Sequence, residues 1–192
     1  MTPLLDTSLG GRAYLNAGQL LHALPRPGGV TRVRVRFRRL TTRPGRWARD
    51  AQPGQQETAQ ATLYLGDRTE TLRFMTDPGL RLKTGAVEPV CEIRDLNVMG
   101  DHHDPSSAEL SFEGPVWPAM IEACKLIMSD RPGASTRFPV SVDGGAFLLD
   151  PAPVNGRLRL ERLQDRMGVR LLRVTVTGGG VMVVGLTGLK TV

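Results

Sequence analysis

Residues 31–40 read Thr-Arg-Val-Arg-Val-Arg-Phe-Arg-Arg-Leu, and no other stretch says as much about the fold. Three apolar side chains, Val33, Val35 and Phe37, alternate with arginines. A period of two is typical of a β-strand, because successive side chains point to opposite faces of a sheet. The β-branched valines favour the same conformation. The stretch therefore predicts a strand with one apolar face and one cationic face.

Glycine-containing turns on either side of this stretch indicate further antiparallel strands. Gly66-Asp67 is suited to a tight hairpin, and Asp143-Gly144-Gly145 gives a second hairpin signal. Gly178-Gly179-Gly180 lies between two further strands, where a hairpin fits better than a phosphate-binding loop, which should lead into a helix. The expected strands cover residues 58–65, 69–75, 89–98, 108–112, 137–142, 146–150, 157–163, 168–177 and 181–187.

Two short helices are expected. The first covers residues 16–24, with Asn16 as its N-cap, and the second covers residues 118–129, where apolar residues form one stripe. Residues 41–57 are rich in Pro, Gly and Gln, so a long mobile loop is expected there.

These elements predict an α+β protein with a mostly antiparallel β-sheet and two short helices. Helix and strands follow in the same order twice, which suggests two related helix-plus-meander halves near residues 1–100 and 108–192, packed as one compact unit. The polar stretch 100–107 is the expected boundary. Residues 26–35 also match residues 131–140 at several positions, so internal duplication is a hypothesis.

A doubled helix-and-strands unit of this kind resembles the repeated units of DNA sliding clamps and also Whirly-type single-strand binders. Both resemblances imply contact with DNA. Clamps line their DNA channel with helices, whereas the basic row here lies on a strand, so the sequence departs from the clamp pattern.

The positive charge is concentrated in one segment. The chain has a net charge of +6, while residues 31–50 contain eight arginines and one acid, so the rest of the chain is close to neutral. A localised cationic patch is what an anionic partner would require.

The predicted site is this patch. Guanidinium groups on one face of a strand would recur every 6.6–7 Å or so, close to the spacing of backbone phosphates. Trp47 lies between arginines and could stack on an unpaired base, or could instead anchor the loop to the core. The alternative for the strand is a solvated face whose arginines pair with acids such as Glu70 or Glu92. The predicted nucleic-acid-binding residues are Arg32, Arg34, Arg36, Arg38, Arg43, Arg46, Trp47 and Arg49.

The stretch Asp101-His102-His103-Asp104 is similar to the Asp-His-His signature of a phosphoesterase family. The resemblance covers three residues, and the chain contains no Asp-x-Asp to supply further ligands. Adjacent histidines in an extended segment point to opposite sides, so a polar loop is the preferred interpretation. No metal, cofactor or catalytic residue is therefore predicted.

The sequence thus predicts a non-enzymatic protein that binds the backbone of a nucleic acid, DNA rather than RNA being favoured, with little sequence preference. One alternative is an oligomeric scaffold whose arginine face meets an acidic partner. Another is a small-molecule-binding β domain or metal-dependent hydrolase. Two cysteines and no visible export signal favour the cytoplasm, with no membrane partner and with homo-oligomerisation open.

Overall fold

The computed structural model describes residues 2–8, 13–25, 27–85, 92–101, 104–114, 116, 119–120, 123–124, 137–145, 155–166, 169–176 and 180–188. Within these residues, the main body is a ten-stranded sheet in the order β3-β5-β4-β2-β9-β12-β11-β10-β8-β7. Every pairing in this sheet is antiparallel. The prediction of a mostly antiparallel β-sheet with few helices is therefore confirmed.

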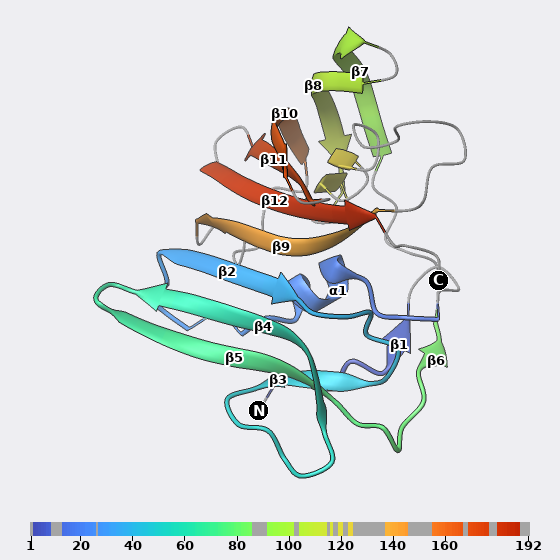
Figure 1. Cartoon of the computed structure of the whole chain (residues 1–192), viewed down its shortest axis with the longest axis vertical. Coiled ribbons are helices and arrows are strands. Elements are labelled where there is room, and N and C mark those ends of the chain that lie inside the picture. Colours follow the sequence, from blue (N-terminus) through green and yellow to red (C-terminus); the bar gives the residue numbers. More distant parts are fainter. Residues whose placement is uncertain are drawn as a thin grey trace.

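The strands of the first half are β2 (Arg32–Phe37), β3 (Gly45–Ala48), β4 (Gln56–Leu65) and β5 (Arg68–Thr76). The strands that follow are β7 (Glu92–Asp101), β8 (Asp104–Glu113), β9 (Arg137–Gly145), β10 (Asn155–Arg166), β11 (Val169–Val176) and β12 (Gly180–Gly188). A separate two-stranded parallel pair joins β1 (Thr7–Ser8) to β6 (Lys83–Thr84). Figure 1 shows the large sheet running from β3 at the lower end to β7 at the top.

The strand β2 lies at the centre of the sheet, between β4 and β9. Val33 and Val35 point to the buried face, as the alternation predicts, and neither is exposed to solvent. Because β2 pairs with β9 over residues 32–36, the two halves of the chain share one continuous sheet.

The helix α1 (Ala17–His22) covers the buried face of the first half. Asn16 caps it as predicted: its side chain accepts a hydrogen bond from the Gln19 backbone N–H, and the Gln19 side chain accepts one from the Asn16 N–H. Leu20 and Leu21 then belong to the same buried core cluster as Ala59 and Ala61 of β4.

The second predicted helix lies largely outside the described residues. Four residues of that stretch are described, and all are helical and buried: Ala119, Met120, Ala123 and Cys124. Within the described part of the chain, no helix is both long and apolar enough to cross a membrane.

Two local predictions are wrong. Residues 41–57 are not one mobile loop, because β3 lies within them and pairs with β5. Asp143-Gly144-Gly145 does not form a hairpin turn, because these residues complete β9 and pair with β2 on one side. Gly144 faces Val33 and Gly145 faces Arg32, so the glycines lie in the middle of the sheet. The Gly66-Asp67 turn does join β4 and β5, and Gly66 has the positive φ that glycine permits.

The predicted boundary at residues 100–107 falls within the β7–β8 pair, where Asp101 lies opposite Asp104. Both strands lie at the far edge of the sheet on the side of the second half. The division into two halves near residues 1–100 and 108–192 stays a proposal.

Candidate functional site

The central arginines of β2 share one carboxylate on β9. Arg32 donates hydrogen bonds from Nε and Nη2 to the two Asp143 oxygens, both at 2.7 Å. Arg34 lies directly opposite Asp143 and donates from Nε to Oδ2 at 2.8 Å. Arg32 also lies over the Tyr64 ring, 5.3 Å from its centroid. Two of the predicted phosphate ligands are thus engaged within the chain.

The charges of this cluster reinforce one another. Burial raises the pKa of the Asp143 carboxyl, but the hydrogen bonds and charges of Arg32 and Arg34 outweigh it and hold the pKa below its usual range. The Asp143 hydrogen bond in turn raises the pKa of Arg32. The carboxylate therefore stays ionised and the pairs stay formed at neutral pH.

A second carboxylate, Glu57 on β4, lies between two further arginines. Arg38 Nε is 2.9 Å from Glu57 Oε1, and Arg73 Nε is 3.2 Å from Oε2. Oε1 is buried and forms an ion pair rather than an aligned hydrogen bond. Arg38 also donates from Nη2 to the Gln60 side-chain oxygen at 2.8 Å. Arg49 pairs with Glu70 at 2.8 Å.

The same pattern continues across the outer face of the second half, the face opposite the helices. Arg159 lies within 3.7 Å of Glu109 and 3.0 Å of Glu161. Arg94 at the sheet edge pairs with Glu92 and with Glu113. Arginine–carboxylate pairs thus cover the outer face, which is the solvated alternative considered from the sequence.

The remaining predicted ligands do not gather into a clamp. Arg36 is exposed on β2, and Arg46 is half-buried on β3; neither side chain has a hydrogen bond or ion pair with a described residue. Arg43 donates to the Leu80 backbone oxygen at 3.2 Å.

Trp47 cannot stack on a base, because only 2% of its surface is exposed. Its ring meets Phe74 edge to face at a centroid distance of 5.4 Å. Its Nε1–H donates to the Leu20 backbone oxygen at 2.8 Å. Trp47 therefore joins β3 to α1, as the anchor that the sequence left as an alternative.

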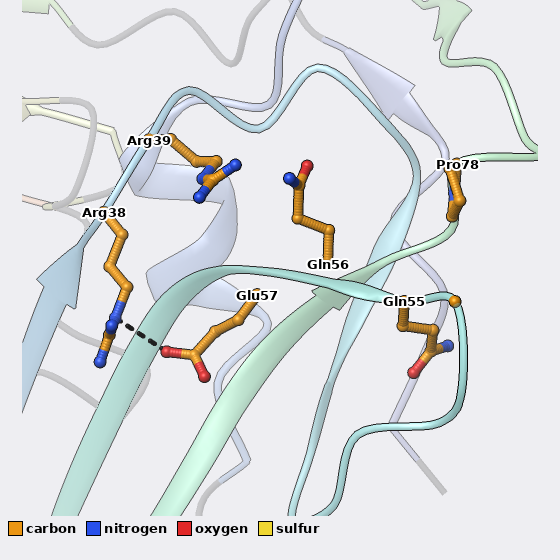
Figure 2. Close-up of a pocket in the computed structure, with 7 residues that line it drawn as sticks. Arg38, Arg39, Gln55, Gln56, Glu57 and Pro78 are labelled. Carbon is orange, nitrogen blue, oxygen red and sulfur yellow. Dashed lines mark ion pairs between the residues drawn. The ribbon is translucent and has the colours of Figure 1, made fainter.

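A depression of about 570 Å³ lies at the end of β2 (Figure 2). Its walls are residues 38–39 after β2, residues 54–57 at the start of β4, and Pro78 after β5. The backbone N–H groups of Arg38 and Arg39 both donate to the Thr58 oxygen, which fixes this corner against β4. Sequence reasoning missed Arg39 and the glutamines as site residues, because only the chain's return in β4 brings them together.

The side chains that line the depression are mainly guanidinium and amide groups, and they do not include a nucleophile paired with a base. In the described part of the chain, no serine, threonine or cysteine side chain is hydrogen-bonded to a histidine. Nor do three His, Cys, Asp or Glu side chains among these residues come close enough together to hold a metal ion. Asp101 and Asp104 are strand residues, while His102 and His103 lie outside the described residues.

The fold is similar to that of a solved structure. The chain resembles a candidate thioesterase II from Thermobifida fusca YX, with a TM-score of 0.51 and 14% identity over 95% of this chain and 89% of that one. A tesB protein from Mycobacterium avium subspecies paratuberculosis gives a TM-score of 0.48 at 13% identity, with 96% and 88% coverage. A conserved protein with a hot dog fold from Alicyclobacillus acidocaldarius gives 0.49 at 13% identity, with 97% and 89% coverage.

No protein-family model matches the sequence, and no curated protein matches it. At such low identity, the likeness to the Thermobifida structure concerns the fold alone.

Two predictions are corrected by these findings. A nucleic-acid-binding function and partner are wrong, because the Thermobifida structure, whose fold this chain shares, is described as a thioesterase candidate and not as a nucleic-acid-binding protein. The ion pairs explain the error physically, since a guanidinium that already holds a carboxylate gains little by exchanging it for a phosphate. The expectation of a non-enzymatic protein is contradicted by the same comparison, and the alternatives of a scaffold and of a small-molecule-binding β domain or metal-dependent hydrolase fit it no better.

Proposed function

We propose that this chain is an enzyme that acts on acyl thioesters, with thioester hydrolysis as the reaction. The observation that carries the proposal is the fold likeness to the Thermobifida thioesterase candidate over nearly the whole of both chains. In hydrolysis, water adds to the thioester carbonyl, the carbon–sulfur bond breaks, and a carboxylic acid and a thiol leave. This reaction requires no metal or redox partner.

We also propose that the chain consists of two related halves of the hot dog type. In each half a helical stretch precedes a strand, and these strands, β2 and β9, pair at the centre of the sheet. The sequence match supports the relation, because the matched arginines, Arg32 and Arg137, are the first residues of β2 and β9.

The strand order beyond this centre differs between the halves. Outward from β2 the order is β4, β5 and β3, whereas outward from β9 it is β12, β11 and β10. In the first half, the hairpin of β4 and β5 lies between β2 and β3 in the sheet. In the second half, β10, β11 and β12 pair in sequence order as a meander, and β12 then pairs with β9. The halves thus differ in which strand lies next to the central one: β4 lies next to β2, and β12, the last strand of its meander, lies next to β9.

A panel of acyl-CoA substrates from two to sixteen carbons, each assayed by the release of free CoA thiol, tests the function. We expect release above the buffer rate, with one chain-length range favoured over the others. The matched control is the same protein after heat denaturation. Equal rates for the native and denatured samples across the panel would contradict the proposal.

A further inference from the structure

Arg39 lies at the wall of the depression, and its guanidinium group pairs with no acid among the described residues. Its side chain is exposed and has no ion pair or hydrogen bond with a described residue. Arg38 beside it is different, since Glu57 and Gln60 hold its guanidinium. Arg39 therefore keeps its donors available to a ligand.

The local charge balance favours an anion. Two arginines and one acid, Glu57, line the depression. Glu57 is also shared with Arg73, which lies outside the lining. The carboxylate is thus already matched by two guanidinium groups, and the charge of Arg39 stays uncompensated. An uncompensated guanidinium at a concave surface attracts anions more strongly than one on an open face.

Neutral donors stand close to this cation. The Gln56 backbone is fixed, because its oxygen accepts a hydrogen bond from Thr76 Oγ1 at 3.0 Å. Its side-chain amide has no partner among the described residues, and Figure 2 shows this amide and the Arg39 guanidinium turned toward the same space. Gln55 completes the wall, and its side-chain oxygen accepts from the Gln52 N–H at 3.2 Å.

We propose that this depression binds the phosphate group of a small organic phosphate, with Arg39 as the principal ligand and Gln56 as the second. Guanidinium groups match phosphate oxygens in bidentate geometry, and an amide can donate to a third oxygen. The volume of about 570 Å³ exceeds what a phosphate alone requires and lies within the range of small-molecule sites. The depression therefore has room for the part of the organic group that adjoins the phosphate.

We assign the bound phosphate to the molecule that carries the acyl group, and this assignment rests on the proposed function. Acyl groups are carried as thioesters on phosphopantetheine, whose phosphate lies at the opposite end from the sulfur. A site for that phosphate would bind one end of the carrier and leave the thioester at its other end free to reach another part of the protein. Free inorganic phosphate is the competing source of the same chemistry.

The binding test uses the full chain and isothermal titration calorimetry at low ionic strength. The ligands are phosphopantetheine, pantetheine and inorganic phosphate. We expect phosphopantetheine to bind more tightly than the other two, and Arg39→Gln to weaken it at least tenfold. Arg36→Gln is the matched control, because the Arg36 side chain on β2, three positions before Arg39, is exposed, has no partner among the described residues and does not line the depression. Gln56→Ala should weaken binding less than Arg39→Gln.

Equal affinity of wild type and Arg39→Gln would overturn the proposal, as would equal losses in Arg39→Gln and Arg36→Gln. Tighter binding of inorganic phosphate than of phosphopantetheine would overturn the carrier assignment.

Hydrolysis measured on the same variants separates the two proposals. Acyl-CoA turnover in wild type with an unchanged KM in Arg39→Gln would support the function and overturn the carrier site. No turnover, together with Arg39-dependent binding of phosphopantetheine, would support the phosphate site and overturn the function. A raised KM at unchanged kcat in Arg39→Gln is the result expected if both are right.

Discussion

Arg34 and Asp143 lie directly opposite each other on β2 and β9, although 109 residues separate them in the chain, and their side chains meet at 2.8 Å. With Arg32 on the same carboxylate, this contact joins the halves across the centre of the sheet. It also explains why an arginine row that looks uncompensated in sequence is compensated in space.

We expect Asp143→Asn to lower the free energy of unfolding by about 1–2 kcal/mol at pH 7, because two charged hydrogen bonds lose their acceptor charge in a partly buried setting. Asp143 has a lowered folded-state pKa, so its contribution is present above the ordinary carboxyl range and is lost as the pH falls below it. Urea unfolding at pH 7 and pH 3 measures both. The control is Glu109→Gln, whose exposed pair with Arg159 should contribute less than about 0.5 kcal/mol. A deficit for Asp143→Asn that does not shrink at pH 3 would contradict this account.

Gly45→Ala should destabilise the fold by about 1–3 kcal/mol, because a Cβ at this position would lie 2.5 Å from the Met75 backbone oxygen and 2.6 Å from Phe74 Cε1. The matched control is Gly28→Ala, where no atom lies within 4 Å of the added carbon. Thermal unfolding of both variants checks the prediction. Equal melting temperatures would show that β3 does not pack as described.

Trp47 should be shielded from solvent in the native state. In a Trp117→Phe background, iodide should quench its fluorescence weakly before unfolding and strongly afterwards. Adding a single-stranded oligonucleotide should leave the emission unchanged, because the ring is already packed against Phe74 and bonded to Leu20. Strong quenching of the folded protein would place the indole on the surface instead.

Cys124 should be unreactive in the folded protein. Burial raises the pKa of its thiol to about 12, so only about one molecule in ten thousand carries the thiolate at pH 8. In a Cys91→Ser background, a disulfide reagent should react only after unfolding. Because the folded pKa is raised, the associated stability is present at neutral pH and is lost as the pH rises from about 9 toward 12. Rapid labelling under native conditions would contradict the burial.

Local patterns predicted much of the fold. The alternation of Val33 and Val35, the Asn16 cap and the Gly66-Asp67 turn each depend on neighbours within a few residues, and the structure has all three. The Asp143-Gly144-Gly145 turn failed because a turn motif competes with sheet pairing on both sides of a strand, and pairing with β2 and β12 prevailed.

The prediction that the arginines of β2 are free to bind a nucleic acid was wrong for a different physical reason. Whether an arginine is free depends on acids that reach it across the sheet, and the partner of Arg32 and Arg34 lies more than a hundred residues away in the chain. The same dependence on distant pairing hid the depression, since Arg39 and Gln56 become neighbours only when β4 returns beside β2.

The most direct test of the central claim is a product analysis by mass spectrometry of the purified chain incubated with an acyl-CoA in large molar excess. We predict that free fatty acid and free CoA appear in equal amounts and exceed the protein concentration many times over. Recovery of intact acyl-CoA from the native protein, for every chain length supplied, would contradict the assignment to acyl-thioester chemistry.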